Sequence, residues 1–309
     1  MRDGRPLRNR VAGTMQAGAY DAPMLERGLH LPSALKANAR FERLGSSSIP
    51  ALIVHPTWEA GDRAPVLMWM HGRTARKEID PGRYLRLMRS GIGVCAVDLP
   101  GHGDRFEAAL QHPAHTLDLV LQMTDEIDEL IDAMHGMDDL FDRERMAVGG
   151  MSAGGMATMA RLCHDHPFVC AAVEASTGSW RHQLHREMFR GQMGPDIVDV
   201  NPMENLDDWR EIPFLAIHSV GDAWVSYEGQ RSFVEAVRGR YERPELVEMV
   251  ADEVAGAPFE HAGFGKFASE AKDVLKDFLR RHLLGEGAAE GRNQAAERSN
   301  ESARGDGRV

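Results

Sequence analysis

The chain has 309 residues, enough to bury one sizeable hydrophobic core without a second domain. Hydrophobic residues make up 43% of it and charged residues 27%, the ordinary balance of a soluble globular protein. The formal net charge of -11 at pH 7 leaves no basic excess to neutralise phosphates, which excludes nucleic acid and anionic membranes as general partners.

Cysteine usage and the lack of a long apolar segment both favour the cytoplasm. Cys95, Cys163 and Cys170 lie in apolar stretches and form no C-x-x-C motif, as is typical of reduced core thiols. The first ten residues are basic but lack the apolar stretch of a secretory signal. No segment approaches the roughly 20 apolar residues of a membrane span. We therefore expect a cytoplasmic protein without a membrane partner.

The two ends of the chain differ in composition from its middle. Residues 1–20 carry few core-forming side chains, and residues 285–309 contain no aromatic residue, leucine or isoleucine. Such segments cannot bury enough apolar surface to offset the entropy lost on ordering. The sequence thus predicts a disordered N-terminus over 1–20, one domain over 21–284 and a disordered tail over 285–309.

Short apolar runs follow one another through this domain. The first two, residues 41–44 and 50–55, flank the turn-like Gly45-Ser46-Ser47-Ser48 and predict an antiparallel hairpin. The later runs are continuously apolar, as strands buried on both faces of a parallel sheet are. They cover residues 65–70, 92–97, 146–149, 169–173, 213–218 and 246–250.

Helical patterns separate these runs. Asp80 and Pro81 supply an N-cap and a first-turn proline for a helix that ends near Arg89. Apolar residues at helical spacing predict further helices over 113–134, 225–237 and 264–284, and one directly after Ser152. Strands that alternate with helices imply right-handed crossovers. The expected fold class is therefore α/β, with a mostly parallel, doubly wound sheet and an N-terminal antiparallel hairpin.

One of the strands ends in a motif that can carry a nucleophile. Residues 146–149 lead into Gly150-Met151-Ser152-Ala153-Gly154, which is G-x-S-x-G between an expected strand and an expected helix. This context lifts the serine off the end of the sheet, and the glycines leave room for neighbouring backbone. By itself the motif is weak, because an ordinary glycine-rich turn has the same pattern.

Partners for Ser152 follow two later strands. Asp222 lies in the loop after one of them, and His261 lies after the next, just ahead of the last helix. Carboxyl ends of parallel strands meet at one edge of a sheet, so we expect Ser152, Asp222 and His261 to form a triad of nucleophile, acid and base. Taken singly, Asp222 would be a surface aspartate and His261 a helix-capping histidine. Glu174, at the end of an earlier strand, is the alternative acid.

A serine nucleophile also needs two N–H donors for the oxyanion that develops on its substrate. One is the amide of Ala153, at the N-terminus of the following helix. The second is expected from His71-Gly72-Arg73-Thr74, after the strand at residues 65–70. Within that loop the Arg73 N–H is the first choice and the Thr74 N–H the second, while His71 is expected to order the loop.

Together these segments resemble the α/β-hydrolase superfamily over about residues 40–284. The matching pieces are His71-Gly72, Asp98-Leu99-Pro100-Gly101-His102-Gly103, the G-x-S-x-G motif, Asp222 and His261. Within the superfamily the chain looks most like the dienelactone-hydrolase-like and prolyl-oligopeptidase-related serine esterases. Dienelactone hydrolases use a cysteine nucleophile where this chain has Ser152, which argues against a dienelactone substrate. The resemblance implies a bracing role for Asp98.

Residues 176–209 break the alternation, at the place where this fold commonly grows a cap. We expect a small cap insertion there. Its apolar side chains, Trp180 and Met188 among them, either line a substrate pocket or pack the insertion onto the domain. Thr74, Met151 and Trp224 are further candidates for the pocket wall.

The sequence thus predicts a serine carboxylesterase that cleaves a small-molecule ester through an acyl-enzyme intermediate. The same triad fits an aminopeptidase or amidase, and a thioesterase or acyltransferase; an ester is favoured because no peptide subsite is recognisable. The alternative from another class is a catalytically silent binding protein on a hydrolase fold. The sequence has no nucleotide-binding glycine motif and no second cluster of metal ligands, so neither cofactor nor metal is expected. A homodimer is compatible with these features.

Overall fold

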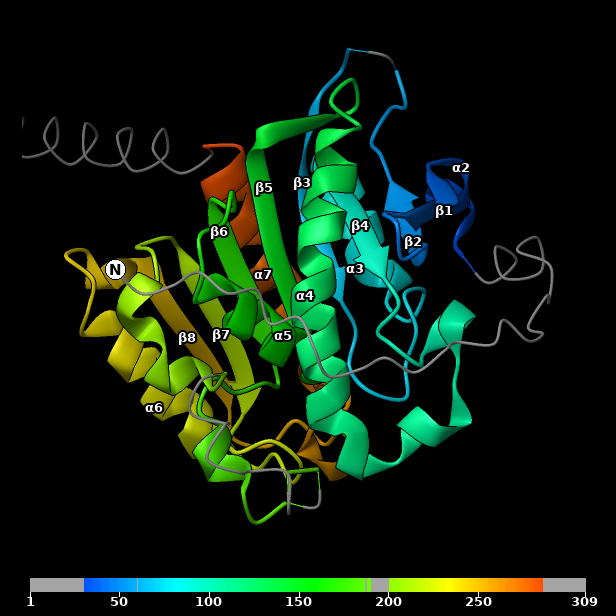
Figure 1. Ribbon diagram of the computed structural model, residues 1–309. Helices are drawn as coiled ribbons and strands as arrows, with labels where there is room; N and C mark the ends of the chain where they lie inside the picture. The colour runs from blue at the N-terminus through cyan, green and yellow to red at the C-terminus, as the bar shows by residue number, and fades with distance from the viewer. Residues whose placement is uncertain (1–30, 60, 187, 190–199, 286–309) are drawn as a thin grey trace, which may run out of the picture.

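The computed structural model describes residues 31–59, 61–186, 188–189 and 200–285 (Figure 1). The predicted disordered segments, 1–20 and 285–309, lie outside these residues except for Gly285. Part of the predicted cap insertion, 187 and 190–199, lies outside them as well. The domain boundaries therefore stay predictions. None of the described helices is long and apolar enough to cross a membrane.

Eight strands form one sheet in the order β1-β2-β4-β3-β5-β6-β7-β8. β1 and β2 form an antiparallel hairpin, β2 runs antiparallel to β4, and all other neighbours are parallel. The predicted fold class is thereby confirmed, including its antiparallel start. The strands are β1 Ala39–Leu44, β2 Ile49–Val54, β3 Ala64–Met70, β4 Gly93–Val97, β5 Phe141–Met151, β6 Cys170–Glu174, β7 Phe214–Ser219 and β8 Val247–Asp252.

Helices cover both faces of this sheet (Figure 1). One face packs against α4, α5 and α6, and the other against α2, α3 and α7. The bounds are α2 Ser33–Ala37, α3 Pro81–Arg89, α4 Thr116–His135, α5 Ala153–Leu162, α6 Tyr227–Arg238 and α7 Ala268–Leu283.

Burial on both faces explains the continuously apolar strands. In β3, Met68 and Met70 join the core under α4 and α5, whereas Leu67 and Trp69 join the core on the opposite side. Successive side chains of a strand point to opposite faces, so a strand that is covered twice needs apolar residues at every position.

Local capping sets where the helices begin. The carboxylate of Asp80 accepts a hydrogen bond from Arg83 N at 3.2 Å, as its predicted N-cap role requires. The helix expected from residue 225 begins two residues later, at Tyr227, because the Ser226 hydroxyl caps it by accepting from Gly229 N at 3.1 Å. The helix expected from 113 begins at Thr116, after a 3₁₀ turn over Pro113–His115.

Candidate active site

The turn between β5 and α5 holds Ser152 in a strained conformation. Its φ of 53° and ψ of -117° lie where residues with a side chain are rare. Glycines make the close approach possible: a Cβ on Gly150 would lie 2.5 Å from the carbonyl carbon of Gly154, and one on Gly154 would overlap the Met70 oxygen. Helix and strands therefore pack against the turn and present the serine side chain at the edge of the sheet.

The three residues expected to act together meet at this edge. His261 Nε2 lies 3.1 Å from Ser152 Oγ, and His261 Nδ1 lies 2.7 Å from Asp222 Oδ2. An ionised carboxylate can only accept, so Nδ1 carries the proton and Nε2 is left to accept from the serine hydroxyl. This is the hydrogen-bond order that activates a serine.

Several donors hold the carboxylate of Asp222. Its Oδ1 accepts from the backbone N–H groups of Trp224 and Val225, both at 2.8 Å. Burial raises the pKa of Asp222, but hydrogen bonds from His218 and His261 outweigh it and hold that pKa below its ordinary value of 3.8. Asp222 is therefore ionised at neutral pH.

His218 is a supporting residue that sequence reasoning missed. It lies on β7 and is fully buried, with Nε2 3.5 Å from Asp222 Oδ2 and 3.3 Å from Val225 O. Both neighbours are acceptors, so Nε2 carries the proton and points it at the acid loop. The available signal was a histidine inside a continuously apolar strand, four residues before the predicted acid.

Glu174, the alternative acid, is engaged elsewhere. Its two carboxylate oxygens accept from Arg83 Nη1 at 2.6 Å and Nη2 at 2.7 Å, and both side chains are buried. This bidentate pair ties β6 to α3. The geometry therefore favours Asp222 over Glu174 as the partner of His261.

The loop after β3 lies directly beside Ser152. A Cβ on Gly72 would lie 3.1 Å from Ser152 Cβ. His71 Nδ1 is 2.6 Å from Gly72 O, and His71 Nε2 is 3.1 Å from Leu99 N. A carbonyl only accepts and an amide N–H only donates, so the ring is neutral with its proton on Nδ1. This bond fixes the Gly72–Arg73 peptide, whose N–H points away from His71 because the peptide is planar and trans.

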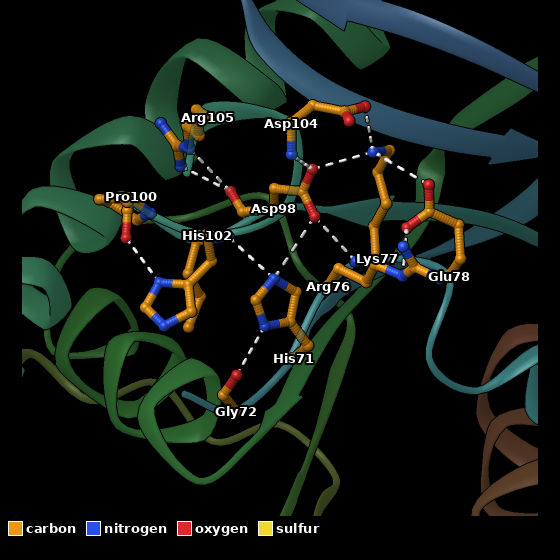
Figure 2. A network of polar contacts seen from close by, with 12 residues as sticks. His71, Gly72, Arg76, Lys77, Glu78, Asp98, Pro100, His102, Asp104 and Arg105 are labelled. Carbon is orange, nitrogen blue, oxygen red and sulfur yellow. Dashed lines mark hydrogen bonds and ion pairs between the residues drawn. The ribbon is translucent and has the colours of Figure 1, made fainter. Parts of the chain in front are cut away.

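A buried network around Asp98 holds that loop in turn, as Figure 2 shows. Asp98 accepts from Lys77 N at 2.8 Å, Lys77 Nζ at 2.9 Å and Asp104 N at 2.9 Å. Burial raises the pKa of Asp98, but the charge of Lys77 and the hydrogen bonds that Lys77 donates outweigh it and lower the pKa. The loops after β3 and β4 are thus tied together, which accords with the bracing role expected of Asp98.

The Arg73 side chain points away from the serine. Its guanidinium donates at 2.6 Å to Thr116 Oγ1, at the start of α4, and also to Gln111 O. Burial lowers the pKa of Arg73. Its backbone N–H, not its charge, is therefore what Arg73 offers to an oxyanion.

The five side chains expected near the substrate have different surroundings. Trp180 is fully buried against Phe189 in the core, so it packs the insertion onto the domain instead of lining a pocket. Met188 also packs on that core. Thr74 is exposed and Met151 is half-buried. Only Trp224 of this group has a ring contact with His261, with centroids 5.1 Å apart.

Comparison with known proteins places the chain in a family. The sequence model of the prolyl oligopeptidase family matches residues 84–284, more than half of the chain. The chain belongs to the prolyl oligopeptidase family. It is accordingly a serine hydrolase. Esterase YjfP of Escherichia coli (strain K12) is 24% identical to it over 251 residues, which are 77% of this chain and 96% of the esterase.

Solved structures of other hydrolases share the fold. The acylaminoacyl peptidase of Pyrococcus horikoshii superposes with a TM-score of 0.63 at 17% identity, over 79% of this chain but only 42% of the peptidase. The Pyrococcus furiosus esterase Pf2001 superposes with a TM-score of 0.56 at 16% identity, over 89% of this chain and 98% of the esterase. At such identities the likeness concerns the fold alone.

His102 makes the stability of this region depend on pH. The ring is buried 5.8 Å from that of His71, and its Nδ1 donates to Pro100 O at 2.8 Å. Its Nε2 has no hydrogen-bond partner among the described residues. Burial lowers the pKa of His102 to about 4. The unfolded chain therefore takes up this proton more readily than the folded protein does.

We expect the contribution of the uncharged His102 ring to the free energy of unfolding to be fully present above about pH 6.5. This contribution should be lost as the pH drops towards 4. In His102→Asn the side-chain amide keeps the bond to Pro100 O but does not titrate, so up to about 3 kcal/mol of this loss should disappear. Urea denaturation at pH 7 and pH 4.5 measures it. His115→Asn, at a side chain that is 43% exposed, is the control, and an unchanged acid dependence in His102→Asn contradicts the assignment.

Proposed function

We propose that this serine hydrolase cleaves carboxylic esters through an acyl-enzyme intermediate. The continuous hydrogen-bond chain from Ser152 Oγ through His261 to Asp222, at 3.1 and 2.7 Å, carries the proposal. In it Ser152 is the nucleophile, His261 the general base and Asp222 the group that keeps the imidazole in the required tautomer.

The reaction then runs in two halves. Ser152 Oγ attacks the ester carbonyl while His261 Nε2 takes its proton. The amides of Ala153 and Arg73 hold the oxyanion, and the N-terminal end of α5 adds its positive dipole. Collapse of this intermediate expels the alcohol, which receives the proton from His261. Water activated by the same nitrogen then attacks the acyl-serine and releases the acid.

The comparisons support an ester as the substrate. The chain matches 96% of the length of the E. coli relative, and that relative is named an esterase. The second candidate is a peptidase or amidase, favoured by the family itself and by the acylaminoacyl peptidase fold. That peptidase is matched over only 42% of its chain, however, whereas the esterase is matched over 96% of its length.

A fluorophosphonate probe tests the nucleophile. We expect the wild-type protein to be labelled, because the activated Oγ displaces fluoride, and Ser152→Ala to show no labelling. Ser90→Ala, at the C-terminal end of α3, is the matched control and should label as the wild type does. Mass spectrometry of the labelled peptide identifies the residue. An unlabelled wild-type protein would overturn the proposal.

Paired amide substitutions test the acid. Asp222→Asn should lower kcat on the order of 10⁴-fold, because the amide no longer fixes the productive tautomer of His261. Glu174→Gln should leave kcat close to the wild-type value but destabilise the fold by about 1–3 kcal/mol, since it removes one of the two carboxylates that pair with buried Arg83 and leaves only Asp80. Steady-state kinetics and urea denaturation measure both. A loss of kcat confined to Glu174→Gln reassigns the acid.

Matched substrates test the class of bond. Initial rates on esters, anilides and thioesters of the same acyl group should rank the ester above the anilide, because an alkoxide leaves more readily than an anilide nitrogen. The ester should also be turned over faster than the thioester, although a thiolate is the better leaving group. The Ser152→Ala protein sets the background. Faster turnover of the anilide would assign the protein to the amidases, and faster turnover of the thioester to the thioesterases.

A further inference from the structure

Two aromatic side chains form an exposed surface beside the proposed base. The rings of Trp224 and Phe259 stack with centroids 5.1 Å apart at 26°, and Trp224 also lies 5.1 Å from the His261 ring. Trp224 is 40% exposed and Phe259 is 61% exposed, the largest value among the described large hydrophobic residues. We call this pair the aromatic shelf.

The backbone holds Phe259 outward at a cost. Phe259 and Glu260 have φ values of 57° and 53°, two successive left-handed residues of which neither is glycine. Such strain costs roughly 1–3 kcal/mol per residue and persists only where other contacts enforce it. It is found preferentially at functional sites, so a ring held in solvent by strained backbone calls for an explanation beyond ordinary surface exposure.

The contacts that enforce this conformation come from the same two loops. The Glu260 carboxylate accepts from Ala255 N at 2.6 Å and from Gly256 N at 2.9 Å. Ala223 N donates to Phe259 O at 2.9 Å and so ties the acid loop to the histidine loop. The shelf is therefore a built surface, fixed to the two loops that carry Asp222 and His261.

The chemistry of His261 indicates which part of a substrate meets the shelf. On collapse of the tetrahedral intermediate, Nε2 must lie within about 2.6–3.2 Å of the leaving oxygen. The carbonyl oxygen turns instead towards the amides of Ala153 and Arg73. The alcohol part of the ester therefore extends from the histidine side of the site, where the Trp224 ring lies.

We propose that the aromatic shelf binds the alcohol part of the substrate, and that the preferred esters carry a planar, apolar alcohol such as a benzyl group. The inference rests on the proposed esterase function. Offset stacking on Trp224 and Phe259 suits a flat ring, and burying the two exposed rings against it removes apolar surface from water.

Three esters test the alcohol side and the acyl side of the site independently. Benzyl acetate and methyl acetate share the acyl group, so they form the same acyl-enzyme and differ only in the alcohol. Benzyl alcohol and methanol have closely similar acidity, so the two esters have leaving groups of similar reactivity. Methyl phenylacetate is the isomer of benzyl acetate with its ring on the acyl side. The measured quantity is kcat/KM, which reports the steps up to release of the alcohol.

Phe259→Asn removes one ring of the shelf, and asparagine tolerates the left-handed backbone better than most other non-glycine residues. We expect kcat/KM for benzyl acetate to fall about tenfold, and that for methyl acetate and methyl phenylacetate to stay within about twofold. Trp224→Ala should act in the same direction, and Trp224→Phe should restore most of the preference. Titration of active sites with the fluorophosphonate corrects each variant for the folded, reactive fraction.

Other outcomes overturn the proposal in distinguishable ways. A loss confined to methyl phenylacetate places the acyl part on the shelf. An equal loss on all three esters means that the rings only position His261, and no loss on any ester means that they bind nothing. A wild-type protein that neither labels nor cleaves any ester overturns the proposed function, and this inference with it.

Discussion

The left-handed backbone of Ser152 is the constraint around which the surrounding elements are packed. A conformation of this kind costs roughly 1–3 kcal/mol and needs external support. Ser152 N donates to Glu174 O at 2.8 Å, while Ser152 O accepts from Met156 N at 2.9 Å and from Ser176 Oγ at 2.8 Å. Strand β6, helix α5 and the start of the insertion therefore all hold one residue. Its hydroxyl is left at the sheet edge, where loops from β7 and β8 deliver Asp222 and His261.

The loop after β3, which carries Gly72 and Arg73, depends on buried charge for the same rigidity. The Lys77 ammonium is almost fully buried and contacts the carboxylates of Asp98, Asp104 and Glu78. Buried charges are costly unless paired and hydrogen-bonded, so neither the loop after β3 nor the loop after β4 can shift without breaking several of these contacts. The Gly72–Arg73 peptide lies within this frame. The two proposed oxyanion donors, the N–H groups of Ala153 and Arg73, are preorganised only if the β5–α5 turn and the loop after β3 are fixed relative to each other.

The sequence predicted the parts of the site that follow from strand order. Ser152, Asp222 and His261 each come directly after an apolar run, and parallel strands bring such positions to one edge. It did not predict His218 or the pairing of Arg83 with Glu174. These contacts join residues on different elements, and composition carries no record of which buried polar groups meet.

Apolar side chains in loops were predicted least well, for a related reason. For Trp180 the sequence left a pocket role and a packing role open, and Trp224 was a candidate for the pocket wall; Trp180 is fully buried and Trp224 is exposed on His261. Hydrophobicity alone does not say whether a loop residue packs inward or lines a site. Phe259 was missed because its outward position comes from a left-handed backbone, which no pattern of residue types around it announces.

The two carboxylates that could orient His261, those of Asp222 and Glu174, have different electrostatic surroundings. The charge of Glu174 is neutralised at close range by Arg83, whose pKa is raised because attraction to Glu174 and Asp80 outweighs its burial. Asp222 has no cation at hydrogen-bond distance among the described residues; its donors are two histidines and two backbone amides. Its negative charge is therefore uncompensated in the resting site, and in the proposed mechanism it is paired only when His261 takes the serine proton. A carboxylate in that state stabilises the imidazolium at the moment it forms, whereas one already bound to arginine has little field left to offer.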